Sequence, residues 1–247
     1  MVTGGEMGPD DDGASFAHAL ATLKEQGSAL LVVGAVPEEM FAAASATMLG
    51  DPDADPPRRR LVVTAESGRE RALRRLRDTG PLSPEYARLI TQGEHARSAA
   101  TATGAGGEAG GLGSQPAPRT HVVDGPPDEV GAVITEVIEA FGSAAGGLAP
   151  AEFRMAFDCL RTLLSEYGRE AAFRVLHAMI GQVRSVSGMV HVRLLREPSA
   201  EVVKLFEPLF DATVELRVDG SALDQRWRFR DRDLTSDWLP VGGVDNA

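Results

Sequence analysis

The stretch SALLVVGAVPEEMF, residues 28–41, decides the fold class of this 247-residue chain. Residues 28–33 form an almost continuous apolar run with β-branched side chains, which is typical of a strand buried on both faces of a parallel sheet. Gly34 ends the run, and Pro37 suits the first turn of a following helix. A buried strand, a short turn and an amphipathic helix in this order favour an α/β protein.

The same order of strand and helix continues along most of the chain. Apolar runs predict further strands near residues 61–64, 120–123, 152–158 and 189–195, and helical patterns separate them. Two helices are expected between the last two of these strands, over residues 160–168 and 169–188. Residues 212–220 and 222–230 read as a closing hairpin. We therefore expect a mostly parallel sheet flanked by helices, with an antiparallel hairpin at the C-terminal edge.

Composition divides the chain into one domain and three less ordered segments. Residues 1–14 read as a disordered acidic tail, and the first helix is expected from Phe16. Residues 15–241 form a single α/β domain. Within it, residues 96–118 are rich in Ala, Gly, Ser and Thr, lack periodicity and read as a flexible insertion. Residues 242–247 are expected to be a C-terminal tail.

The charge and the rare residue types exclude several classes of function. A net charge of −11 disfavours non-specific binding to nucleic acid or to an anionic membrane. No apolar run reaches about 18 residues, and no signal peptide begins the chain, so we expect a cytoplasmic protein that does not enter a membrane. The single cysteine, Cys159, reads as a small buried residue. The five histidines lack metal-ligand spacing, and no metal site is expected.

The opening stretch can be compared with a nucleotide-binding P-loop, which reads G-x-x-x-x-G-K-[ST] between a strand and a helix. With Gly34 aligned to the first glycine, the second glycine, the lysine and the hydroxyl residue become Glu39, Met40 and Phe41. A carboxylate in the first helical turn complements the helix dipole and repels a triphosphate. Met40 and Phe41 suit the apolar face of the helix. The stretch thus lacks the groups that hold phosphate.

The C-terminal half carries a family resemblance. The segment FRMAFDCLRTLLSEYGREAAFRVLHAMIGQVRSVSGMVHVRLL, residues 153–195, resembles the core of RecA/KaiC-type ATPases, in which a strand ends in a Walker B aspartate and a long helix and a strand follow. Residues 209–241 resemble the end of that domain, where a D-x-x-x-E-L strand pairs with the next strand. Over residues 16–241 the chain is similar to a haloarchaeal family of Htr-like proteins of unknown function, which look like RecA/KaiC domains without a P-loop.

The resemblance implies roles for three positions. Asp158 matches the Walker B aspartate that would hold the shell of Mg²⁺, Glu66 falls near the acidic position that activates water, and Gly34 matches the first P-loop glycine. From the residues alone, Asp158 can equally be a polar residue that caps the next helix. Glu66 can equally be a loop carboxylate without a catalytic role.

These observations predict a non-catalytic, RecA/KaiC-like pseudo-ATPase that acts in regulation or signal transduction through contacts with a protein partner. We expect no catalytic residue and neither ATP nor Mg²⁺ as a cofactor, because a base without a held phosphate has nothing to attack. One alternative is a ligand-binding sensor or enzyme that uses the crevice at the carboxyl ends of the strands, near Gly34–Pro37, Glu66 and Asp158.

A second alternative uses the arginine-rich stretch of residues 58–77, which contains eight arginines in an acidic protein. These side chains can form a solvated helix face paired with neighbouring carboxylates. They can also form a basic patch for an acidic partner or for DNA, which would make the protein a DNA-associated accessory factor. Few aromatic residues are available to stack on bases, so nucleic acid is not the expected partner.

Overall fold

The structure, a computed structural model, describes residues 9–93, 117–232 and 234–242. Its centre is one twisted sheet with the strand order β10-β8-β7-β1-β6-β5-β2-β3-β4, and β9 pairs with β8. The strands are β1 (Ser28–Val33), β2 (Arg59–Ala65), β3 (Ala87–Gln92), β4 (Arg119–Val123), β5 (Phe153–Phe157), β6 (Met189–Arg193), β7 (Ala212–Asp219), β8 (Ala222–Phe229), β9 (Leu234–Thr235) and β10 (Leu239–Pro240). The seven strands from β7 to β4 pair in parallel, whereas β7, β8 and β10 pair antiparallel.

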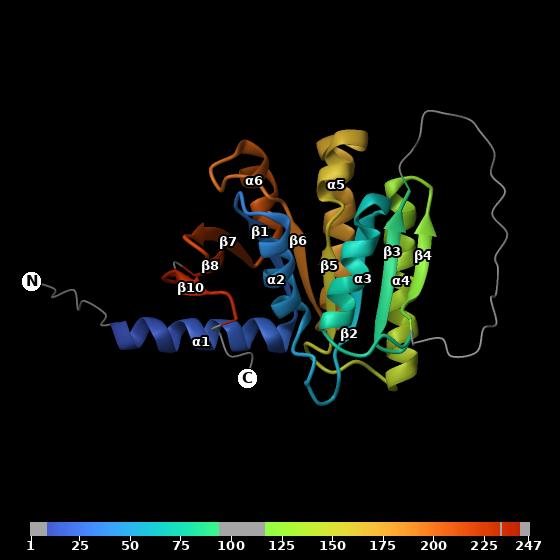
Figure 1. The fold of residues 1–247 in the computed structure, drawn as a ribbon, viewed down its shortest axis with the longest axis horizontal. Coiled ribbons are helices and arrows are strands. Elements are labelled where there is room, and N and C mark those ends of the chain that lie inside the picture. The colour runs from blue at the N-terminus through green and yellow to red at the C-terminus, as the bar shows by residue number, and fades with distance from the viewer. Residues whose placement is uncertain (1–8, 94–116, 233, 243–247) are drawn as a thin grey trace, which may run out of the picture.

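Helices cover both faces of this sheet, as Figure 1 shows. They are α1 (Pro9–Gln26), α2 (Glu38–Leu49), α3 (Arg69–Asp78), α4 (Pro127–Ala145), α5 (Leu160–Ser185) and α6 (Glu201–Phe206), with short 3-10 turns at Glu66–Gly68 and Glu207–Leu209. The helices α4, α5 and α6 pack on one face, and α1, α2 and α3 pack on the other. The expected mostly parallel α/β sheet with a C-terminal hairpin is therefore confirmed.

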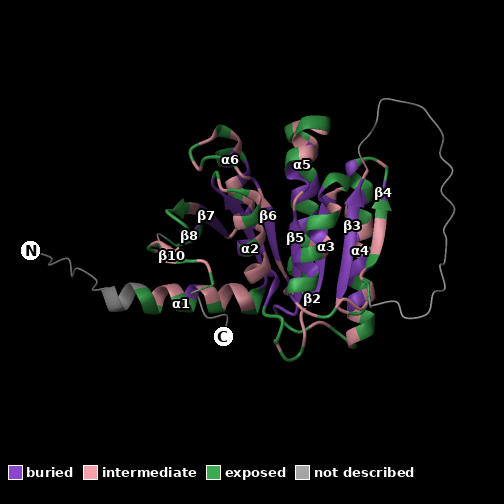
Figure 2. Ribbon diagram, in the orientation of Figure 1, coloured by how far each residue is buried: buried purple, intermediate pink, exposed green. Residues whose placement is uncertain are grey.

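The alternation of side chains along β1 explains why its sequence is apolar throughout. Ala29, Leu31 and Val33 pack against the α4–α6 layer, whereas Leu30 and Val32 pack against the α1–α2 layer. Successive side chains of a strand point to opposite faces, so a strand covered on both sides needs no polar position. Figure 2 shows the buried strands at the centre of the molecule and the exposed residues on the outer sides of the helices.

Three elements differ from the expectations or refine them. The helix α1 begins at Pro9, seven residues before the expected start at Phe16, and proline is favoured at the first helical position because its φ angle is already helical. The strand β3 was not predicted. The two helices expected over residues 160–188 are both present: α5 is broken at Gly168, where φ is 80° and ψ is 178°, so the expected boundary between them is confirmed.

Parts of three predictions fall on residues that the structure does not describe. These are residues 1–8 of the expected N-terminal tail, residues 94–116 of the expected insertion and residues 243–247 of the expected C-terminal tail. Within the described parts of the chain, no helix has the length and apolar character needed to cross a membrane.

Candidate functional site

A crevice lies at the carboxyl ends of four parallel strands. After β1 the chain crosses to β2 on one side, and after β6 it crosses to β7 on the other side of β1. The loops that follow the neighbouring strands β1 and β6 therefore lead in opposite directions along the sheet. Open α/β sheets form ligand crevices at such positions. The cavity there has a volume of about 260 Å³. Its charged lining residues are Glu38, Arg71, Asp158, Arg161, Arg193 and Arg196.

The first feature of this crevice is a carboxylate that two arginines hold at the start of α2. Arg193, the last residue of β6, donates to both carboxylate oxygens of Glu38, and its Nη1 lies 2.9 Å from Oε1. Arg71 of α3 places its Nε 3.5 Å from the same Oε1. Glu38 is in the first turn of α2, where a negative charge interacts favourably with the helix dipole. The helix N-terminus is thus neutralised by a carboxylate of the chain itself.

The second feature is a buried ion pair beneath the crevice. Arg75 Nη2 donates to Asp158 Oδ2 over 2.5 Å, and the side chains are only 5% and 8% exposed. The other terminal nitrogen of Arg75 donates to Ser45 Oγ over 2.7 Å, and Ser45 Oγ lies 2.6 Å from His191 Nε2. A charge buried to this degree is stable only when it is paired and hydrogen-bonded. Asp158 therefore has a structural partner in the position where the resemblance implies a metal.

Phe41 separates these two groups of charges. Its side chain is 1% exposed. The guanidinium of Arg193 lies 4.6 Å from the centre of its ring, and that of Arg75 lies 5.7 Å from it. Both distances are within the range of cation–π attraction. The position that carries a hydroxyl in a P-loop is occupied here by a ring that packs against two cations.

The turn after β1 is held too tightly to open toward a ligand. The N–H of Gly34 donates to the carbonyl oxygen of Arg196 over 2.9 Å. Gly34 has a φ of 114°, and a Cβ atom at this residue would lie 2.1 Å from the carbonyl oxygen of Leu216. Glycine is needed both for the positive φ and for the close approach to β7. The first amide of this turn is therefore bound within the protein.

Burial also controls the two reactive side chains near the crevice. Burial lowers the pKa of His191 to about 3, and the charges of Arg75 and Arg154 add to the shift. Burial raises the pKa of the Cys159 thiol well above its usual value, and Asp158 adds to that shift. Both groups are therefore neutral at pH 7. This confirms Cys159 as a small buried residue, with a side chain that is 0% exposed.

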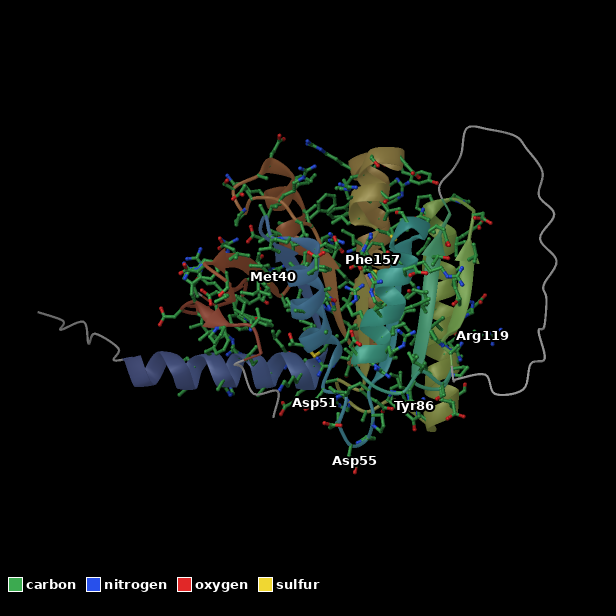
Figure 3. All side chains as sticks on the ribbon, in the orientation of Figure 1. Met40, Asp51, Asp55, Tyr86, Arg119 and Phe157 are labelled. Carbon is green, nitrogen blue, oxygen red and sulfur yellow. The ribbon has the colours of Figure 1, made fainter. Side chains whose placement is uncertain are left out.

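Of the six positions singled out in the sequence, only Asp158 lines the cavity. Glu39 is exposed, and Met40 is half-buried on α2. Figure 3 shows Met40 and Phe157 toward the end of the sheet that carries the crevice, and Asp51 and Tyr86 toward the opposite end. Glu66 is exposed in the 3-10 turn after β2 and lies 3.6 Å from Arg69.

The arginine-rich stretch does not form one continuous exposed face. Arg59, with a side chain that is 8% exposed, pairs with Glu152 over 2.8 Å. Arg60 is fully buried and donates to the carbonyl oxygen of Leu76, in the last turn of α3, and to that of Pro81, beyond the end of α3. With Arg75 also buried, three of the eight arginines stabilise the interior and belong neither to a solvated helix face nor to a basic patch.

The residues that sequence analysis missed are arginines from the second half of the chain. Arg161 lies in the first turn of α5, Arg193 ends β6, and Arg196 follows in the loop before α6. Their meeting with Glu38 depends on the parallel pairing of β1 with β6, in which Val32 is opposite Arg193. No local pattern reveals this pairing.

The donor set of the crevice does not fit a bound metal ion. Within the described residues, no group of three or more His, Cys, Asp or Glu side chains is placed to hold a metal. Asp158 receives the Arg75 guanidinium at 2.5 Å, so a positive charge of the protein already occupies its Oδ2 side. A divalent cation bound there would have to displace Arg75 from a buried position.

Comparison with known proteins gives a family and no activity. A family described as a family of unknown function (DUF7504) matches residues 27–216, which include β1 to β6, the first part of β7 and all the charged residues of the crevice. No curated protein matches the chain.

Proposed function

We propose that this chain, which belongs to the DUF7504 family of unknown function, is a non-catalytic RecA/KaiC-like domain that acts in regulation or signal transduction through contacts with a protein partner. The observation that carries the proposal is the Glu38–Arg193 pair at the start of α2, the helix end at which a P-loop protein would bind phosphate. The chain supplies its own anion there, together with the arginine that neutralises it.

Two further contacts support this proposal. The Arg75–Asp158 pair puts a guanidinium against the aspartate that would face Mg²⁺. Phe41 fills the space of the hydroxyl residue that would complete the metal shell. Phosphoryl transfer depends almost entirely on positioning the phosphate and its metal ion. The sequence lacks the second glycine and the lysine that would hold the phosphate, and the two carboxylates that line the described crevice, Glu38 and Asp158, are each paired with an arginine.

A hydrolysis assay with Mg-ATP tests the proposal. We expect phosphate release from the wild-type protein to equal that of a buffer blank and to be unchanged in Asp158→Asn. Asparagine keeps the shape of the side chain but leaves the buried Arg75 without its anion, so the unfolding midpoint of Asp158→Asn is measured beside its activity, and a loss of activity reports on the carboxylate where the variant is folded. Arg174→Gln, at an exposed site of α5 beyond the break at Gly168, is the matched control for purification and handling. Hydrolysis that disappears only in Asp158→Asn would overturn the proposal.

A further inference from the structure

We infer that the crevice binds a small oxyanion with two or more negative charges, and that Arg161 and Arg196 are its main ligands. This site goes beyond a role in protein contacts. The cavity also contains Glu38, Arg193 and Asp158, which argue against catalysis, but the two main ligands are not among those residues. Variants of Arg161 and Arg196 therefore test the site separately from the proposed function.

The first argument is the balance of charge in the cavity. Its lining has four guanidiniums, from Arg71, Arg161, Arg193 and Arg196, against the carboxylates of Glu38 and Asp158. That excess of two positive charges lies in a chain whose net charge is −11. Low-dielectric walls concentrate the field of such a cluster inside a cleft. An anion of matching charge would neutralise it.

The second argument is that two of these arginines have no acidic partner. Arg71 and Arg193 share Glu38, whereas Asp158 is paired with the buried Arg75. No ion pair or side-chain hydrogen bond of Arg161 or Arg196 occurs among the described residues. Nearly every other cation around the crevice has a carboxylate within reach, so these two guanidiniums are available to a ligand.

The third argument is the position of Arg161 in the first turn of α5. A positive charge at a helix N-terminus opposes the helix dipole, and acidic residues are preferred there. The first turn of α5 contains no acidic residue. An anion in the cavity would satisfy both the guanidinium of Arg161 and the positive end of the helix. The hydroxyls of Thr162 and Ser67 also line the cavity and can donate hydrogen bonds.

The size of the cavity limits the ligand. Its volume of about 260 Å³ lies just below the range of about 300–1,000 Å³ typical of sites for larger small molecules. Phosphate, pyrophosphate and compact di- or tricarboxylates share the chemistry that the arginines recognise, because guanidinium forms bidentate hydrogen bonds with both phosphoryl and carboxylate groups.

Calorimetric titration with inorganic phosphate, pyrophosphate and citrate tests the inference, at one ionic strength maintained with KCl. We expect saturable binding of at least one of these probes, and its identity separates a phosphoryl ligand from a polycarboxylate. Arg161→Gln and Arg196→Gln should each weaken that binding about tenfold or more, since each removes a charge-assisted contact. Arg174→Gln, on α5 beyond the break at Gly168, should leave the affinity unchanged.

The possible outcomes are distinct. Saturable binding that both crevice variants weaken and the control preserves supports the site. Absence of saturable binding for all three probes, or equal binding by all four proteins, overturns it. Arg161 and Arg196 are exposed, so the variants should unfold at the wild-type midpoint in KCl alone, which separates lost binding from lost folding. ATP should bind no more tightly than pyrophosphate. ATP hydrolysis that depends on Asp158 would contradict the proposed function, but it would not change the conclusion drawn from the binding affinities of Arg161→Gln and Arg196→Gln.

Discussion

Replacing Arg75 by methionine should strongly destabilise the fold, because it leaves Asp158 buried without its partner. The two side chains are 5% and 8% exposed, and their closest atoms are 2.5 Å apart. Removal of one member of a buried ion pair typically costs about 3–5 kcal/mol, since the remaining charge is desolvated and unpaired. Arg75 also donates to Ser45 Oγ over 2.7 Å, and the loss of that bond acts in the same direction.

Urea denaturation at pH 7 measures this cost. We expect the free energy of unfolding of Arg75→Met to fall by about 3–5 kcal/mol. Asp158→Asn removes the unpaired charge, so the double variant should recover part of the loss, with a coupling energy of about 0.5–3 kcal/mol between the two sites. Arg174→Met is the control, because its pair with Glu170 is largely exposed and should contribute about 0.3–0.5 kcal/mol.

Two results would refute this reasoning. A loss below about 1 kcal/mol in Arg75→Met would mean that the Asp158 carboxylate finds another partner or water. Arg75 would then not be needed to neutralise Asp158. Additive effects in the double variant would mean that the two side chains do not interact in solution. In either case the argument against a metal at Asp158 would lose its main support.

Three other substitutions test the packing around the crevice, each by the free energy of unfolding in urea. Gly34→Ala should cost about 1–3 kcal/mol because its Cβ would meet the backbone of β7, whereas Gly181→Ala, in open space on α5, should gain about 0.5–1 kcal/mol. Phe41→Ala should cost about 3–5 kcal/mol, since it empties a buried site between two cations. His191→Gln should flatten the loss of stability between pH 6.5 and about 3, by up to about 1.4 kcal/mol per pH unit. The reason is that only the unfolded chain takes up the histidine proton in that window.

The apolar runs of the sequence predicted the parallel sheet well because burial on both faces removes polar residues from a strand. The strand β3 escaped notice because its sequence, ARLITQ, combines apolar and polar residues that are all buried. Arg88 lies in this strand with its guanidinium 5.0 Å from the centre of the Phe141 ring, and its Nε donates to the carbonyl oxygen of Pro84. An interior arginine satisfied by an aromatic ring and a carbonyl leaves no simple signal in sequence.

The crevice was partly predictable. The mismatch of Glu39, Met40 and Phe41 with a P-loop could be read directly, and Asp158 was correctly placed at the end of a strand. Arg75 could also have been predicted to be buried, because it shares the helical spacing of the buried residues Ala72 and Leu76 on α3. A buried arginine needs a partner, which makes Arg75 a candidate for pairing with Asp158.

The remaining arginines of the crevice could not be found in this way. Arg193 reaches Glu38 across 155 residues of chain, and only the register of the assembled sheet brings them together. Arg161 and Arg196 are exposed, so neither periodicity nor hydrophobicity distinguishes them from other surface arginines. Their shared property is a position at the carboxyl ends of neighbouring strands, which requires the strand order.

The central claim is that ion pairs within the chain take the place of a metal-bound nucleotide, and its most direct test is the Mg²⁺ dependence of nucleotide stabilisation. Thermal unfolding would be recorded with ATP and pyrophosphate, each with Mg²⁺ and with EDTA, at matched ionic strength. We expect Mg²⁺ to add no stabilisation in the presence of ATP beyond its effect with pyrophosphate. A metal-bound nucleotide at a hundred times its Kd would add about 2.7 kcal/mol. A gain of that size with Mg-ATP alone, lost in Asp158→Asn, would contradict the account.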